Sequence, residues 1–304
     1  MNQEFSEQLV TILGKSKICF DEPMKKHTTF RIGGVADYFV MPNTIEDVQA
    51  ITALCKTSKI PYYILGNGSN LLVGDAGYRG VIIQLYKNMS KMVLMGENIV
   101  VQAGAILSQV ANMALEHELT GFEFAAGIPG TIGGAMIMNA GAYGGEVKDV
   151  VTQVTVLTTN GEIEHLTGEE MQFGYRTSLA AKKQHIVLEA TIKLQKGKKE
   201  IIRTWMEELK KQRTTKQPLN FPSAGSTFKR PEGYFAGKLI QDAGLAGFQV
   251  GGARVSEKHC GFVVNVGEAT AKDVDTLMKQ VSERVREQFG VNLEPEVKRL
   301  GEFS

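Results

Sequence analysis

The 304-residue sequence predicts an α+β fold. Strand-like segments outnumber helical ones and do not alternate strictly with them, so a doubly wound parallel sheet is not expected. The length suggests about two domains and is sufficient for a substantial core. We expect the first domain over residues 1–197, divided again near residue 85, and a smaller second domain over 198–304, with the boundary at Lys196-Gly197-Lys198.

The predicted elements of the first half are short. A first helix is expected at 2–16. A second should begin at Thr44 and Asp47, which resemble a capping box. A third is expected at 107–119, and Gly121 should end it. Period-two or β-branched runs predict strands at 36–41, 62–65, 71–73, 81–85, 92–95 and 99–102.

The second half begins with a predicted hairpin. Residues 150–158 and 162–166 read as strands, and Asn160-Gly161 between them is a strong two-residue hairpin signal. The remaining elements are expected as strands at 186–194, 261–266 and 291–300 and as helices at 199–213, 234–243 and 271–289. Gly290 should close the last helix, and residues 218–231, with three prolines, read as a loop.

Composition excludes several classes of protein. Hydrophobic residues at 43% and charged residues at 22% are ordinary for a globular protein, and a net charge of +1 favours neither nucleic acid nor an acidic membrane. The three cysteines form no C-x-x-C pair and the five histidines no H-E-x-x-H, so no metal site is expected. The N-terminal segment contains Glu4 and Glu7 and has no long apolar core, so it is not predicted to be a signal peptide. We expect a cytosolic monomer.

A glycine-rich stretch dominates the middle of the chain. Residues 124–145 contain no charge, but their glycines, Pro129 and Asn139 would weaken a membrane-spanning helix. Closely spaced glycines let backbone N–H groups approach a phosphate. On this stretch alone, a buried turn without a ligand remains an equal alternative.

A second glycine-rich turn, GNGSN at 66–70, lies about sixty residues earlier. It begins like a G-x-G-x-x-G fingerprint, but Leu71 occupies the third glycine position. The P-loop pattern also fails at 233–239, which is one residue short and has Leu239 in place of Ser or Thr. Together the two turns could hold opposite sides of a pyrophosphate.

The two turns resemble the FAD-binding domain of the vanillyl-alcohol oxidase type. Six motifs, HTTFRIGG, GNGSNLLV, GIPGTIGGAMIMNAGAYG, GYRTS, SAGSTFKRP and LEPEV, resemble the UDP-N-acetylenolpyruvoylglucosamine reductase family of peptidoglycan synthesis from about residue 27 to 300. The resemblance implies a two-part FAD-binding domain, a smaller α+β substrate-binding domain, and a final strand returning to the active site. It also implies bound FAD, NADPH as donor and a small-molecule UDP-sugar substrate. The expected cofactor-binding residues are Gly66, Asn67, Gly68, Ser69, Asn70, Gly127, Thr131, Gly134, Gly141 and Ala142.

The resemblance implies three catalytic residues. Arg176 would stabilise the enolate-like charge on the substrate, because a guanidinium pairs well with carboxylates and stays protonated. Ser226 would donate the proton, and Glu296 would polarise the enolate or orient the acid. Without the resemblance, these residues read as a loop arginine, a turn serine and a solvated strand edge. Strand alternation would place Glu294 on the same face as Glu296, so spacing alone does not choose between them.

Four further residues are expected to contact the substrate: Tyr175, Arg213, Lys216 and Lys229, the last also a possible helper of Ser226. Arg213 and Lys216 could instead simply complement the dipole of the helix they end. About 50 residues separate Arg176 from Ser226, which leaves no room for the tyrosine-bearing loop of some relatives. The alternatives left open are an FAD oxidase or dehydrogenase of the same fold and a flavin-free UDP-sugar binding protein.

Overall fold

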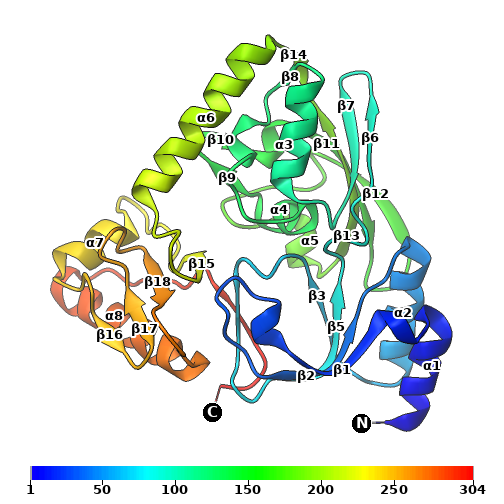
Figure 1. The fold of residues 1–304 in the computed structure, drawn as a ribbon, viewed down its shortest axis with the longest axis horizontal. Helices are drawn as coiled ribbons and strands as arrows, with labels where there is room; N and C mark the ends of the chain where they lie inside the picture. The colour runs from blue at the N-terminus through cyan, green and yellow to red at the C-terminus, as the bar shows by residue number, and fades with distance from the viewer. Residues whose placement is uncertain (1, 304) are drawn as a thin grey trace. The chain divides into compact units, whose positions relative to one another are not determined.

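A computed structural model describes residues 2–303 (Figure 1). Residues 1 and 304, the first residue of the first predicted domain and the last residue of the second, lie outside the described residues. The chain forms two compact units, each built from three segments. Unit 1 contains the chain up to Cys19, Tyr38–Asn67 and Gly80–Arg213, and unit 2 contains Phe20–Asp37, Gly68–Arg79 and the chain from Thr214. Each unit has its own buried hydrophobic cluster. The predicted boundary near residue 197 stays a prediction.

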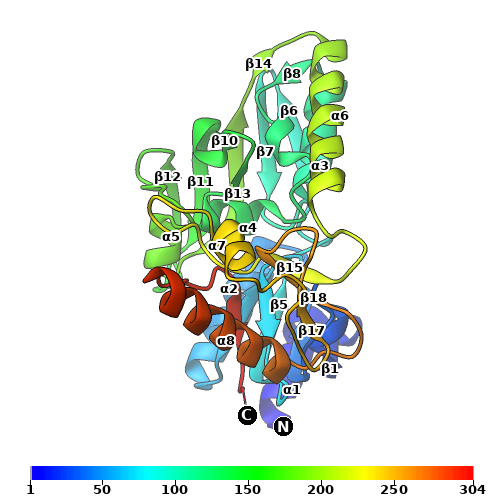
Figure 2. The same cartoon turned by 90° about the vertical axis from the view of Figure 1, so that its left-hand side faces the viewer.

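Unit 1 contains a five-stranded antiparallel sheet in the order β12-β11-β13-β7-β6, which Figure 2 shows from left to right. The strands are β6 (Met92–Met95), β7 (Asn98–Gln102), β11 (Val151–Leu157), β12 (Ile163–Thr167) and β13 (Ile186–Lys193). Strands β11 and β12 pair around Asn160-Gly161, which confirms the predicted hairpin. The fully buried Val101, Val154 and Leu188 contribute this sheet's side of the core.

A four-stranded sheet has the order β1-β2-β5-β3. Its strands are β1 (Ile18–Pro23), β2 (Val35–Val40), β3 (Tyr62–Leu65) and β5 (Tyr78–Gln84). Helices α1 (Gln3–Leu13) and α2 (Ile45–Thr57) contact each other, and Thr44 and Asp47 form the predicted capping box of α2. The sequence therefore placed the start of α2 correctly, because the capping signal is local.

Helix α3 (Leu107–Glu116) is shorter than predicted. Leu119 and Thr120 form strand β8, which pairs with β14 (Gln195–Lys196), so Gly121 does not end the helix. The sequence also missed the short helix α5 (Leu179–Lys182), while α6 (Lys199–Lys216) runs three residues beyond its predicted end. These differences arise where distant segments pair or pack, which local patterns do not report.

The glycine-rich stretch contains a helix that the sequence did not predict, α4 (Ile132–Met138). A Cβ on Gly133 would lie 3.0 Å from the Cβ of Ala103, so glycine permits close packing of this helix. Strands β9 (Gly141–Ala142) and β10 (Gly145–Glu146) then form a small hairpin. Within residues 2–303, no helix is both long enough and apolar enough to cross a membrane.

Unit 2 contains a four-stranded antiparallel sheet in the order β15-β18-β17-β16. Its strands are β15 (Ser223–Ser226), β16 (Gln249–Val250), β17 (Ala253–Val255) and β18 (Phe262–Asn265). Helices α7 (Ala236–Asp242) and α8 (Ala271–Phe289) add apolar residues to the core of this unit. Gly290, in the left-handed conformation at φ 69°, ends α8 as predicted.

The predicted final strand at 291–300 is wrong over most of its length. Only β19 (Lys298–Leu300) forms, in parallel pairing with β4 (Leu71–Val73). Proline has no N–H for a ladder, and Pro295 makes only an isolated bridge with Phe228. Regular strand alternation therefore does not describe Glu294 and Glu296.

Candidate active site

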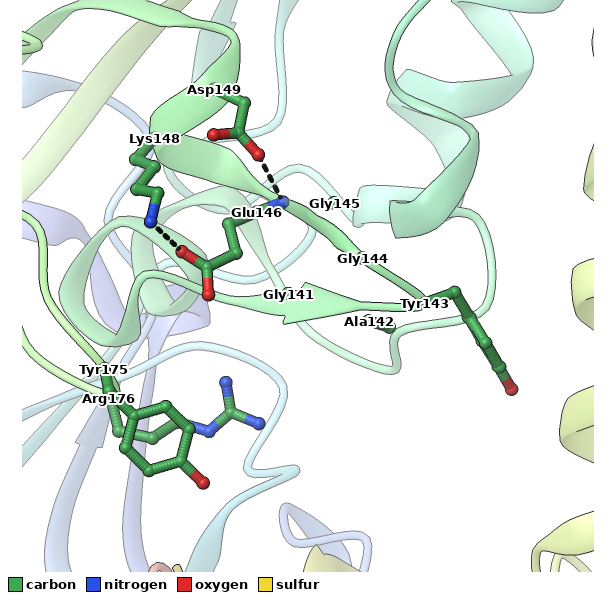
Figure 3. Close-up of a pocket in the computed structure, with 10 residues that line it drawn as sticks. All are labelled: Gly141, Ala142, Tyr143, Gly144, Gly145, Glu146, Lys148, Asp149, Tyr175 and Arg176. Carbon is green, nitrogen blue, oxygen red and sulfur yellow. Dashed lines mark hydrogen bonds and ion pairs between the residues drawn. The ribbon is translucent and has the colours of Figure 1, made fainter. Parts of the chain in front are cut away.

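A pocket of about 380 Å³ lies in unit 1, at the β9–β10 hairpin (Figure 3). It brings together four residues that the sequence singled out: Gly141, Ala142, Tyr175 and Arg176. The sequence missed four charged or aromatic residues that also line it: Tyr143, Glu146, Lys148 and Asp149. Candidate cofactor-binding and substrate-binding residues thus share one cavity, although 30 or more positions separate them in the chain.

Tyr175 and Arg176 occupy the two corner positions of a tight turn. Gly174 and Thr177 close this turn with two backbone hydrogen bonds, of 3.0 and 3.3 Å. Tyr175 is 51% exposed, and the Arg176 guanidinium carbon lies 5.1 Å from the centroid of its ring. Arg176 has φ 55°, a left-handed conformation that costs a non-glycine residue about 1–2 kcal/mol. Strain of this kind persists where the surroundings impose it, often at functional sites.

Glu146 sets the electrostatics on one side of the pocket. Its Oε2 accepts hydrogen bonds from Lys148 Nζ at 2.7 Å and from Asn139 Nδ2 at 2.9 Å. The bond from Lys148 lowers the pKa of Glu146 most; burial opposes it, while Asn139 and the charges of Lys148 and Arg176 add to it. The ionised carboxylate therefore lies between two cationic groups, Lys148 and Arg176, as Figure 3 shows.

The two glycine-rich segments meet within unit 1. Asn67 Nδ2 donates to the Pro129 carbonyl at 3.4 Å, and a Cβ on Gly66 would lie 2.4 Å from Thr131 Oγ1. A larger residue at position 66 would require the Thr131 side chain to shift. The predicted cofactor residues Gly66, Asn67 and Thr131 therefore belong to one structural feature.

The first turn of α4 offers a backbone donor beside this contact. The N–H groups of Ile132 and Gly133 are bound by the carbonyls of Ala105 and Ala103. The N–H of Gly134 has no partner among residues 2–303, and a Cβ there would meet only Thr131 Oγ1, at 3.8 Å. An accessible backbone N–H suits an oxygen of a phosphate or pyrophosphate, so this segment fits the FAD that the sequence predicts.

Arg213 lies near the C-terminal end of α6 and is the last residue of unit 1. Its Cδ would be 3.2 Å from a Cβ on Gly127, and burial lowers the pKa of its half-buried guanidinium, while Tyr143 opposes this. Tyr143 itself has φ 55° and is 41% exposed at the tip of the hairpin. Lys216, the other basic residue predicted near the end of this helix, is exposed and belongs to unit 2.

In unit 2, the segments SAGSTFK and LEPEV lie side by side. Glu296 N donates to the Thr227 carbonyl at 2.8 Å, and Lys229 N donates to the Glu294 carbonyl at 2.8 Å. Ser226 ends β15 immediately before this pairing. The predicted catalytic residues Ser226 and Glu296 therefore lie on neighbouring segments of one unit.

The GNGSN turn and the Lys229 side chain also contact these two segments or their surroundings in unit 2. Asn70 Nδ2 donates to the Glu296 carbonyl at 3.2 Å, and a Cβ on Gly68, whose φ is 63°, would lie 2.1 Å from the His27 carbonyl. The chain passes between the units after Asn67, so Gly68, Ser69 and Asn70 belong to unit 2. Lys229 Nζ pairs with the Glu294 carboxylate.

Comparison with known proteins first defines the class. Residues 36–167 match the FAD binding domain family. An alkyldihydroxyacetonephosphate synthase structure aligns with 64% of this chain and 41% of its own at a TM-score of 0.51 and 15% identity. A Phl p 4 variant described as a glucose oxidase gives a TM-score of 0.51 at 14% identity, over 65% of this chain and 45% of its own. These likenesses show the fold alone. The predicted α+β fold with an FAD-binding domain of the vanillyl-alcohol oxidase type is confirmed.

The particular family follows from closer relatives. Residues 217–300 match the UDP-N-acetylenolpyruvoylglucosamine reductase C-terminal domain. Reductases of this name from Caldanaerobacter subterraneus subsp. tengcongensis and Clostridioides difficile are 53% and 52% identical, covering 97% and 99% of this chain and 98% and 99% of the relatives. The Thermus caldophilus reductase structure is 36% identical, with a TM-score of 0.79 over 92% of this chain and 98% of its own. The chain belongs to the UDP-N-acetylenolpyruvoylglucosamine reductase family, an FAD-dependent oxidoreductase family, as predicted.

Proposed function

We propose that this protein reduces UDP-N-acetylglucosamine enolpyruvate to UDP-N-acetylmuramate in the cytoplasm, with NADPH as the donor, as a step of peptidoglycan precursor synthesis. The observation that carries the proposal is the pocket of unit 1, where Arg176 on its strained turn adjoins the glycine-rich hairpin. The family relationship over nearly the whole chain supports the same reaction.

The glycine-rich segments are the proposed cofactor site. When bound, FAD would supply the hydride-transfer chemistry between NADPH and the substrate alkene. The N–H of Gly134, which has no partner within residues 2–303, and the close approach of Gly66 to Thr131 support a pyrophosphate at this place. The other proposed contributors are Asn67, Gly68, Ser69, Asn70, Gly127, Gly141 and Ala142.

Arg176 is the proposed electrostatic catalyst. Its guanidinium remains protonated in a protein and can bind a carboxylate through two parallel hydrogen bonds. Negative charge accumulates on the enolpyruvyl group as hydride arrives at C3. Arg176 directed at that charge stabilises the transition state more than the ground state.

Ser226 is the proposed proton donor to C2 of the substrate. A hydroxyl is a weak acid, so the role requires a strongly basic acceptor, which an enolate-like carbon provides. We assign Glu296 to polarising the enolate or orienting the acid. The Lys229 ammonium is paired with the Glu294 carboxylate, which favours a positioning role for Lys229 over direct help to Ser226.

Tyr175, Arg213, Lys216 and Lys229 are the proposed substrate contacts. The half-buried guanidinium of Arg213 suits a diphosphate, because burial strengthens its interaction with an anion. Between Arg176 and Ser226 the chain forms α5, β13, β14, α6 and short connections. This supports the short form of the family, without an inserted tyrosine loop.

Anaerobic stopped-flow absorbance tests the proposal by separating its half-reactions. NADPH should bleach the flavin, and the enolpyruvyl substrate should restore its colour. Ser226→Ala should slow the second step by roughly 10²–10⁴-fold, the usual contribution of a positioned general acid, and leave the first step intact. Ser223→Ala, three residues earlier, is the matched control.

Three results would contradict the proposal. If Ser226→Ala loses both half-reactions, Ser226 is not the proton donor. Fast reoxidation by oxygen but not by the substrate would identify an oxidase. A colourless purified protein would identify a flavin-free binding protein.

A further inference from the structure

The C-terminal end of α4 holds the Arg176 turn from both sides. Ser178 Oγ donates to the Ile137 carbonyl at 3.0 Å, and Asn139 Nδ2 donates to the Gly174 carbonyl at 3.2 Å. Gly174 immediately precedes the Tyr175–Arg176 pair, and Ser178 follows it after one residue. The turn is thus anchored on each side of the residues it presents.

Asn139 uses its whole side chain in this arrangement. The residue is 1% exposed and follows α4 in the left-handed conformation, with φ 45° and ψ 58°. Its Nδ2 donates to both Gly174 and Glu146, and its Oδ1 accepts from the N–H of Lys148 at 3.2 Å. One buried amide therefore joins the helix end, the hairpin and the turn.

This arrangement explains how a strained turn is maintained. A left-handed arginine persists only where surrounding contacts impose the conformation. Asn139 supplies one such contact and also binds Glu146, whose charge lies near Arg176. We propose that Asn139 is a positioning residue that fixes the Arg176 turn for the reaction. The inference rests on the proposed role of Arg176.

A purely structural role for Asn139 is the competing explanation, because asparagine often ends helices in the left-handed conformation. Asn139→Gly separates the two explanations. Glycine adopts this conformation readily, so the substitution removes the amide while the backbone can keep its path. Asn160→Gly, in the exposed turn between β11 and β12, is the matched control for the added chain flexibility.

The experiment is a double-mutant cycle on the FAD-loaded enzyme, with Asn139→Gly and Arg176→Lys. We measure flavin reduction by NADPH and flavin reoxidation by the enolpyruvyl substrate. Asn139→Gly should slow reoxidation by about 10–100-fold, the effect of displacing a reacting group by about an ångström, and leave reduction within about two-fold. In the Arg176→Lys background it should slow reoxidation little further, because residues that act through one another are not additive.

Each contrary outcome has its own meaning. If the two effects multiply, or if Asn139→Gly lowers only the melting temperature, Asn139 does not act through Arg176. If Arg176→Lys alone leaves reoxidation unchanged, the proposed role of Arg176 fails instead. Should Asn139→Gly lose its flavin, Asn139→Ala, which removes the same amide without adding a glycine, repeats the cycle at the same position, and the same two results support or overturn the inference.

Discussion

The Arg176 turn of unit 1 and the paired Ser226 and Glu296 segments of unit 2 are held in different ways. Side chains hold the turn, through Asn139 and Ser178. Backbone groups hold the paired segments, through the bonds of Glu296 N to Thr227 and of Lys229 N to Glu294. Substitutions away from the reacting groups should therefore disturb the turn more than the paired segments.

Thr227 makes a buried side-chain hydrogen bond in unit 2, and its removal should have the largest effect on stability. This residue is 2% exposed, and its Oγ1 accepts from the N–H of Val263 at 2.9 Å. Thr227→Val should lower the free energy of unfolding by about 1–3 kcal/mol, because it leaves a buried donor unpaired. Urea denaturation measures this loss, and Thr227→Ser, which keeps the hydroxyl, should recover most of it. A neutral Thr227→Val would mean that the hydrogen bond from Val263 to the Thr227 hydroxyl contributes little to the stability of unit 2.

Glu146 provides an intermediate test in unit 1. Since hydrogen bonding from Lys148 lowers its pKa in the folded state, the unfolded chain takes up a proton first as the pH falls. The ionised carboxylate therefore stabilises the fold above the unfolded pKa of about 4.5, and this contribution is lost as the pH falls through the lower folded pKa.

Glu146→Gln should accordingly cost about 1 kcal/mol at neutral pH, as expected for a partly exposed ion pair with one further hydrogen bond. The difference from the parent should shrink as the pH falls below 4.5. Chemical denaturation at pH 7, 5 and 3.5 measures it. If the difference in unfolding free energy does not change with pH, the ion pair between Lys148 and Glu146 does not stabilise the fold.

The smallest effect is expected at Glu294. The Glu294 side chain, which pairs with Lys229, is 70% exposed. Glu294→Gln should therefore change the free energy of unfolding by less than about 1 kcal/mol. The backbone bond between the same residues remains. Glu283→Gln, on the exposed face of α8, is the control. A loss of several kcal/mol would show that the side chains, rather than the backbone, hold the unit 2 segments together.

Local signals in the sequence predicted much of the fold. The β11–β12 hairpin follows from Asn160-Gly161, and the start of α2 and the end of α8 follow from Thr44 with Asp47 and from Gly290. Helix α4 was missed because its glycines disfavour a helix in isolation, and the close packing of Gly133 on Ala103 is visible only in the folded chain. The strand predicted at 291–300 failed before β19 because alternation ignored the missing N–H of Pro295.

The sequence alone determined the family of this protein, because motif order is written along the chain and needs no folded contact to be read. It also supplied the candidate residues Arg176, Ser226 and Glu296. Only the tertiary structure decided how Arg176 is presented: a left-handed turn whose anchors, Ile137 and Asn139, lie some forty residues earlier. Hydrogen bonds between distant segments depend on packing, and no local pattern specifies them.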